Sequence, residues 1–152
     1  MSFKSVTLTF LTVFSLNFSG LTLAEQPVDG TTAKIQIISP KPYVLTQDTF
    51  INLALESTDP ERVTARVYQN VYDHFENVAL PKGSRLFGYQ AGVINGLHNV
   101  FFTHLQLSDT GQTLTLDPPL QATTPLGATG IVDFKPAAIA GAMLRGDLVI
   151  PH

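Results

Sequence analysis

The residues best suited to acid–base or metal chemistry are the four histidines of this 152-residue chain and the carboxylates near them. His98 and His104 are six positions apart, so on an extended strand their side chains would lie about 20 Å from each other. His74 follows Asp73, and His152 is the last residue. No two histidines have the spacing of metal ligands, and the chain contains no cysteine. We therefore predict no metal site and no cofactor.

A serine nucleophile would have to be Ser84, with His98 and Asp73 as its partners. Ser84 stands in a Lys-Gly-Ser-Arg segment, which does not have the glycine-flanked pattern of a strand-to-helix nucleophile turn. A structural role is the simpler interpretation, because serine hydroxyls commonly satisfy the amides of a turn. The sequence therefore predicts no catalytic residue, and a protein that is not an enzyme.

Charged residues are scarce in this chain. They make up 14% of it, against 44% hydrophobic residues, and nine basic and twelve acidic residues leave a formal net charge of −3. A nucleic-acid surface needs clustered Lys and Arg, and no such run is present. We predict no direct binding to nucleic acid. The low charge also indicates that a partner covers part of the surface.

The first 24 residues have the pattern of a secretory signal. Lys4 is their only charge, Val6–Phe18 is mostly apolar, and Ala24 is the small residue that signal peptidase prefers. The apolar run is shorter than the roughly 20 residues of a membrane-spanning helix. We predict a cleaved signal over residues 1–24, with a retained anchor as the alternative, and a flexible lead-in over residues 25–33. An exported chain without cysteine suits a bacterial periplasm.

The stretch most informative about structure is Leu80–Gly88, near the middle of the chain. Pro81 suits a strand entry or the second position of a turn, because its φ is fixed and it has no amide hydrogen. Gly83 can adopt the positive φ that the third position of a type II turn requires, and Ser84 can satisfy turn amides. Gly88 leaves room for the close approach of another backbone. These residues predict a tight corner that leads into a strand.

Alternating apolar and polar residues predict short strands along most of the chain. The predicted strands are 34–38, 50–56, 62–70, 100–107, 112–116 and 148–150, and 91–96, 117–119 and 121–130 are predicted loops or strand ends. The alanine-rich residues 136–145 have the only helical pattern, with Pro136 in the first turn and Gly146 just after the end. We predict one mainly β domain over residues 34–152, an antiparallel β-barrel or sandwich with one short C-terminal helix.

Phe101 and Phe102 are adjacent within the strand predicted over residues 100–107. Successive side chains of a strand point to opposite faces, so the two rings must face opposite sides. One ring is expected in the core, which leaves the other half exposed or covered by another subunit. Exposed aromatic residues often anchor protein interfaces, so both residues are candidate interface residues.

Four segments in the middle of the chain form an ordered set of motifs. They are Val63–Asp73, which ends in Val-Tyr-Asp, Leu80–Gly88, which contains Pro-Lys-Gly-Ser, Leu105–Gly111, which ends in Asp-Thr-Gly, and Leu126–Asp133, which ends in Val-Asp. In this order they resemble the C-terminal domain of the TrbI family, the outer-membrane core-complex scaffold of type IV secretion and conjugation systems. The resemblance covers about seventy residues.

The resemblance implies a structural β domain that contacts other secretion-system core subunits and copies of itself in the periplasm, in association with the outer membrane. Family members normally carry an inner-membrane helix and a long linker, so we expect a shortened member or a fragment. A monomeric periplasmic binding or chaperone-like β-domain with a ligand cleft is the alternative. Native size separates the two, because a ring component runs far above 16.5 kDa.

N-terminal sequencing of the protein from an envelope fraction should find Glu25 as the first residue, because the apolar run ends at Ala24. Recovery of Met1 in an inner-membrane pellet would instead show a retained anchor.

Overall fold

The computed structural model describes residues 39–152. The predicted signal (1–24), lead-in (25–33) and first strand (34–38) therefore lie outside the described residues. Within residues 39–152 there are ten strands and no helix. The strands are β1 (Val44–Leu45), β2 (Phe50–Asp59), β3 (Arg62–Val67), β4 (Val71–Tyr72), β5 (Val78–Leu80), β6 (Arg85–Ile94), β7 (Leu97–Gln106), β8 (Thr113–Thr123), β9 (Ile139–Met143) and β10 (Leu148–Val149).

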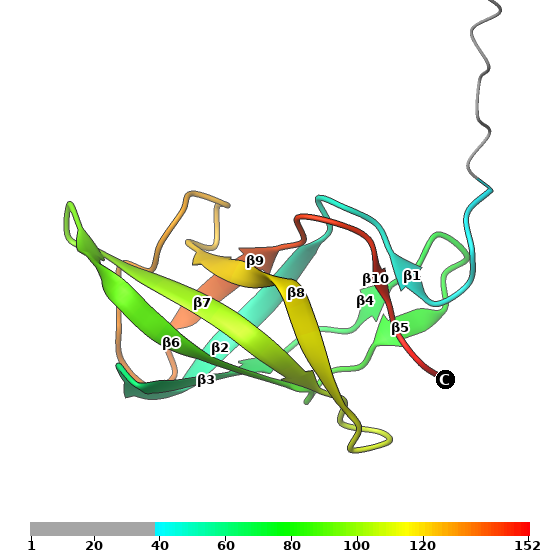
Figure 1. Ribbon diagram of the computed structural model, residues 1–152, viewed down its shortest axis with the longest axis horizontal. Coiled ribbons are helices and arrows are strands. Elements are labelled where there is room, and N and C mark those ends of the chain that lie inside the picture. The colour runs from blue at the N-terminus through cyan, green and yellow to red at the C-terminus, as the bar shows by residue number, and fades with distance from the viewer. Residues whose placement is uncertain (1–38) are drawn as a thin grey trace, which may run out of the picture. The chain divides into compact units, whose positions relative to one another are not determined.

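Six of these strands close into an antiparallel barrel in the order β2-β3-β6-β7-β8-β9, with β9 pairing back onto β2. Two short ribbons, β1–β10 and β4–β5, lie at one end of the domain, and the β6–β7 turn lies at the other (Figure 1). The predicted β-barrel is confirmed. The long strands β3 and β7 both have a partner on each side. An assembly that adds strands to the free edges of β3 or β7 is therefore not available to this barrel.

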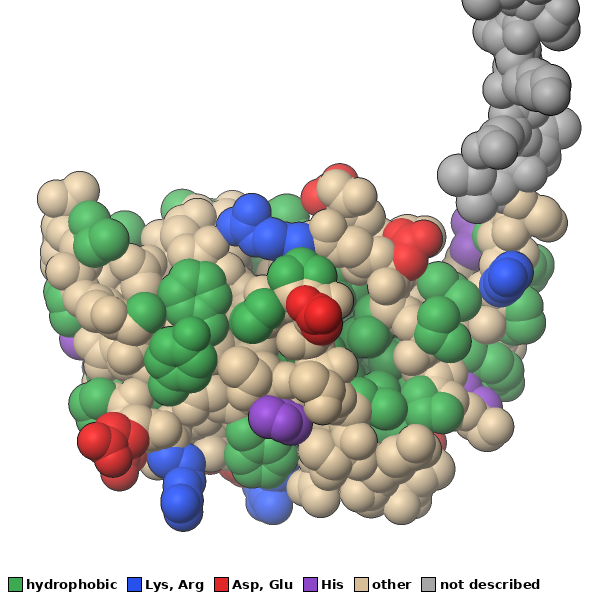
Figure 2. Space-filling model, in the orientation of Figure 1, with side chains coloured by type: hydrophobic (Ala, Val, Ile, Leu, Met, Phe, Trp, Pro, Cys, Tyr) green, Lys and Arg blue, Asp and Glu red, His purple; other side chains and the backbone are tan. Residues whose placement is uncertain are grey.

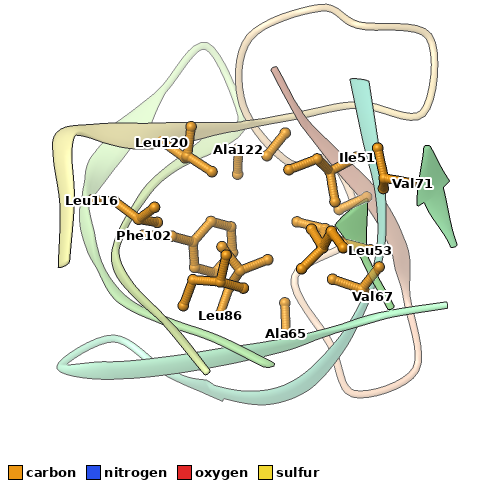
Figure 3. Packing of buried hydrophobic residues seen from close by; sticks show 14 of the residues in the cluster. Ile51, Leu53, Ala65, Val67, Val71, Leu86, Phe102, Leu116, Leu120 and Ala122 are labelled. Carbon is orange, nitrogen blue, oxygen red and sulfur yellow. The ribbon is translucent and has the colours of Figure 1, made fainter. Parts of the chain in front are cut away.

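The core forms because the predicted alternation holds on each strand. On β2, Ile51, Leu53 and Leu55 are buried, and the residues between them are not. The same alternation on β3 buries its valines and Ala65. These side chains converge from opposite walls and, together with Phe102, fill the inside of the barrel (Figure 3). Burial of such aliphatic side chains contributes roughly 1.5–3 kcal/mol each. The barrel is therefore a packed core.

The helix predicted over residues 136–145 is wrong, because β9 occupies this stretch and pairs with both β2 and β8. Alanine content is only a weak helix signal, and tertiary pairing overrides it. A Cβ on Gly141 would lie 2.1 Å from the Phe50 ring, so this ring packs directly against the strand at the glycine. Ala140 and Ala142 are fully buried beside it. The small residues serve close strand packing. Ala137, with a φ of +66°, is not in a helical conformation.

Two predicted strand ends are also wrong. Asp117–Pro119 does not end its strand, because β8 runs on to Thr123. The proline pair lies where the β7–β8 register shifts, between the pairs His104↔Thr115 and Phe102↔Leu120. A proline is tolerated at such an irregularity because no ladder amide is lost there. The second error is at 91–96, because β6 continues to Ile94 and only Asn95–Gly96 turns.

The corner at Leu80–Gly88 connects β5 to β6. Ser84 N donates to Pro81 O (3.2 Å), and Gly83 at the third turn position has a φ of +93°. Pro81 therefore occupies the first position of this turn and not the predicted second position, which Lys82 takes. Gly88 lies against β7, where a Cβ would come within 2.0 Å of the Phe101 carbonyl oxygen. The backbones of β6 and β7 therefore approach each other too closely for any other residue.

Gly88→Ala should destabilise the fold by about 3 kcal/mol, since the added methyl group meets backbone atoms that cannot rotate away. Thermal or urea melts measure this loss. Gly146→Ala is the matched control, because nothing lies within 4 Å of its added Cβ. Equal melting midpoints for the two variants would contradict the close β6–β7 packing.

Candidate interaction surface

The histidines are dispersed over the domain, each with its own neighbours. His98 stacks on Phe134 with ring centroids 4.6 Å apart, and its Nδ1 lies 3.1 Å from Gln90 Nε2. The others are His74, which contacts Phe75, His104, which contacts Thr103, and His152, which stacks on Tyr43. Among the described residues, no three His, Cys, Asp or Glu side chains are grouped so that they could hold a metal ion.

Ser84 is fully buried, and two backbone groups use its hydroxyl. Ser84 Oγ donates to Pro81 O (2.8 Å) and accepts from Ser108 N (3.1 Å). Ser108 Oγ in turn donates to Lys82 O (3.0 Å). The hydroxyl thus ties the corner to the β7–β8 connection. This arrangement is structural and does not prepare a nucleophile.

Asp73, the third residue considered with Ser84 and His98, is buried. Its carboxylate accepts hydrogen bonds from the backbone amides of Tyr43 (2.7 Å), Phe75 (2.8 Å) and Asn77 (2.9 Å), and from the Asn77 side chain (2.9 Å). Burial alone would raise the pKa of Asp73, but these hydrogen bonds outweigh it and lower the pKa to about 2. Asp73 holds its own loop to the start of β1 and has no free oxygen for chemistry.

One surface cleft of about 280 Å³ lies beside β8 and β9. It is lined by Asp48 and Arg145 among other residues, and Arg145 Nη2 donates to Gln121 Oε1 (2.7 Å). Its lining contains no histidine and a single carboxylate. The cleft has the size of a small-ligand site but does not bring together a nucleophile and a base.

Hydrophobic side chains gather on the outer face of β6 and β7 (Figure 2). Phe102 is fully buried inside the barrel, and Phe101 points outward and is partly exposed. Tyr89 stands directly opposite Phe101 on β6, with ring centroids 6.2 Å apart, and is 45% exposed. Together, Tyr89 and Phe101 form an outward aromatic pair on the barrel wall.

Beyond Arg85, the first residue of β6, the β6–β7 hairpin carries no Asp, Glu, Lys or Arg side chain. There is no Asp, Glu, Lys or Arg between Arg85 and Asp109. Near the tip, Val93 is 53% exposed and Ile94 is 61% exposed. The nearest ion-pair group lies at the start of the hairpin, where Glu56 contacts both Arg66 and Arg85. An uncharged surface with exposed aromatic and aliphatic residues is typical of an interface.

Sequence reasoning identified Phe101 and Phe102 as the candidate interface pair but missed Tyr89, Val93 and Ile94. It assigned 91–96 to a loop, so it did not recognise these residues as part of a hairpin. The available signal was the uncharged run between Arg85 and Asp109, which is longer than the uncharged run between Lys4 and Glu25.

No protein-family model matches the chain, and no curated protein sequence matches it. The resemblance to the TrbI family therefore depends on the four motif segments alone. The described residues contain no helix long and apolar enough to cross a membrane.

The lowered pKa of Asp73 predicts a specific loss of stability in acid. A carboxylate whose folded-state pKa is below its unfolded value stabilises the fold above about pH 4, and this contribution is lost as the pH falls through about 2. Melting temperatures of the wild type should therefore drop over that interval. Asp73→Asn should melt lower at pH 7 and lack this drop. Asp133→Asn, at an exposed carboxylate, serves as the control, and a wild-type drop retained in Asp73→Asn would refute the assignment.

Proposed function

We propose that this chain is a structural, non-enzymatic subunit of a type IV secretion or conjugal transfer core complex in the bacterial cell envelope. In this proposal it acts in the periplasm, associated with the outer membrane, and assembles through contacts of its β domain. Its partners are other core subunits of the system and copies of itself.

The positions of the TrbI-like motifs support the proposal. Three of the four segments meet at one junction of the barrel, where Val67 N donates to Ser84 O (2.8 Å) and Ser84 Oγ accepts from Ser108 N (3.1 Å). The fourth segment pairs with β7, because Ile131 and His98 exchange two backbone hydrogen bonds of 2.9 Å. The motif residues thus hold the strands of one fold together. Residues in such positions suit a shared scaffold better than a shared active site.

The observation that carries the proposal is the outward aromatic pair of Tyr89 and Phe101. Aromatic residues are enriched at the centres of interfaces, where a few of them supply most of the binding energy. Here the pair lies on an uncharged hairpin of a barrel whose interior is filled by side chains. Binding by this barrel is therefore expected on its outer wall.

The cleft beside Arg145 favours the second candidate, a monomeric periplasmic binding or chaperone-like domain. Its volume of about 280 Å³ and its mixed polar lining suit a small ligand. A core subunit should co-purify with other envelope proteins and run far above 16.5 kDa, whereas a binding module should run as a monomer.

Phe101→Ser should leave the fold intact and loosen the complex. Truncation of an interface aromatic typically costs about 2 kcal/mol or more, which is roughly a thirtyfold loss of affinity. Co-purification with the other envelope components, compared with the wild type, measures the effect, and a thermal melt checks the fold.

Two further variants make this test specific. Tyr72→Ser removes an aromatic residue that is 55% exposed on the β4–β5 ribbon, and it should leave co-purification unchanged. Phe102→Ser should instead unfold the domain, because Phe102 is fully buried. If Phe101→Ser also unfolds the domain, or if it retains every partner, the aromatic pair is not the interface.

A further inference from the structure

The cleft of about 280 Å³ beside β8 and β9 draws its lining from four parts of the chain. Gln121 on β8 and Met143 on β9 belong to the barrel wall. The turn before β2 contributes Asp48, the loop after β8 contributes Gly127, and the segment after β9 contributes Arg145. These parts are distant from one another in the sequence, so the cleft exists only in the folded domain.

Backbone hydrogen bonds hold the parts of the cleft in place. The turn before β2 and the segment after β9 lie side by side (Figure 1), because Asp48 N donates to Leu144 O (2.9 Å) and Leu144 N donates to Thr49 O (3.0 Å). The loop after β8 is closed by Thr124 N, which donates to Ala128 O (2.7 Å). The cleft is therefore formed before any ligand arrives, which lowers the free-energy cost of binding.

The guanidinium group of Arg145 is oriented by the barrel wall. Its Nη2 donates to Gln121 Oε1 (2.7 Å). Gln121 faces outward on β8, because its neighbours Leu120 and Ala122 are buried. The guanidinium group has several further N–H donors, and Arg145 forms no ion pair among residues 39–152. It therefore presents donors of fixed orientation to an anion in the cleft.

Asp48 supplies the single carboxylate of the cleft lining. Its φ of +67° lies in the left-handed region, which aspartate tolerates better than most residues. Thr49 N donates to Thr46 O (3.2 Å) across this turn. In the described part of the chain, Asp48 forms an ion pair neither with Arg145 nor with any other residue. Two opposite charges thus line one cleft without neutralising each other.

We propose that this cleft binds a small zwitterion, whose carboxylate lies against Arg145 and whose ammonium group lies against Asp48. A simple anion would also meet the Asp48 carboxylate, and a simple cation would meet the guanidinium group. A ligand with both charges complements the lining better than either. The volume of about 280 Å³ is at the lower end for ligand pockets. The ligand class is therefore a free amino acid or a dipeptide.

Titration of the purified chain with glycylglycine, followed by the NMR shifts of its backbone amides, tests the site. The signals of Asp48 and Gly127 should move until they saturate. Glycylglycinamide lacks the carboxylate and N-acetylglycylglycine lacks the ammonium group, so each should bind about tenfold more weakly or worse. The same titration with glycine distinguishes a free amino acid from a dipeptide as the better ligand.

Variants assign each charge of the ligand to its residue. Arg145→Gln should bind glycylglycine about tenfold more weakly and should no longer prefer it to glycylglycinamide. Asp48→Asn should lose the preference over N-acetylglycylglycine, and it should keep the turn because asparagine tolerates the same positive φ. Arg62→Gln is the matched control, since Arg62 is also exposed and lies outside the cleft lining. A general disturbance of the cleft would instead weaken all three peptides equally.

Three outcomes would overturn the inference. Glycylglycine and glycine could both leave the amide signals unmoved at about 10 mM, glycylglycinamide could bind as tightly as glycylglycine, or both variants could keep the wild-type preferences.

The inference goes beyond the proposed role in assembly and does not depend on it. Phe101→Ser should bind glycylglycine like the wild type while it loses the other envelope subunits. Arg145→Gln should keep those subunits while it loses the ligand. Failure of the cleft and failure of the proposed function therefore give different results.

Discussion

Closure of the barrel depends on how closely β9 can approach its two neighbours. Gly141 lies under the Phe50 ring and beside Thr123, and a Cβ there would come within 2.1 Å of the ring and 2.9 Å of the threonine oxygen. β9 pairs with β8 through only two residue pairs. This is the shortest pairing between neighbouring strands of the barrel. A larger residue would require the Phe50 ring and the Thr123 hydroxyl to move from their present positions. The small residues of β9 thus let the sheet close.

The barrel is closed and its interior is filled by side chains. Contacts with other molecules are therefore expected on its outer surface. The interior is packed with aliphatic side chains around Phe102, and the reactive-looking Ser84 and Asp73 are both held by backbone groups. Their hydrogen bonds join segments that lie far apart in the sequence, so they contribute rigidity rather than reactivity. The β6–β7 hairpin beyond Arg85 is one outer surface with exposed aromatic and aliphatic residues and no such structural use. Fold and proposed function are therefore linked, since the barrel holds this hairpin in place.

The β6–β7 hairpin has two parts that differ in their strand pairing. The aromatic pair of Tyr89 and Phe101 lies on the barrel wall. It follows directly after Gly88, where the pairing of β6 with β3 ends. The open edge at residues 91–94 begins where β6 extends past β3 and the bulge at Ala91 redirects the strand.

The alternation of apolar and polar residues by itself determined the mainly β fold. It also determined which side chains of β2 and β3 point into the barrel, because a period of two residues specifies which face of a strand is buried. The local chemistry at Gly83 and Gly88 likewise predicted the corner and the close approach of two backbones. Only the tertiary structure decided that 136–145 is a strand, that β8 passes through its prolines, and that residues 91–94 form an edge. These outcomes depend on which strands become neighbours. Helix propensity and turn residues are local preferences of less than about 1 kcal/mol per ordinary residue, and pairing across a closing barrel outweighs them.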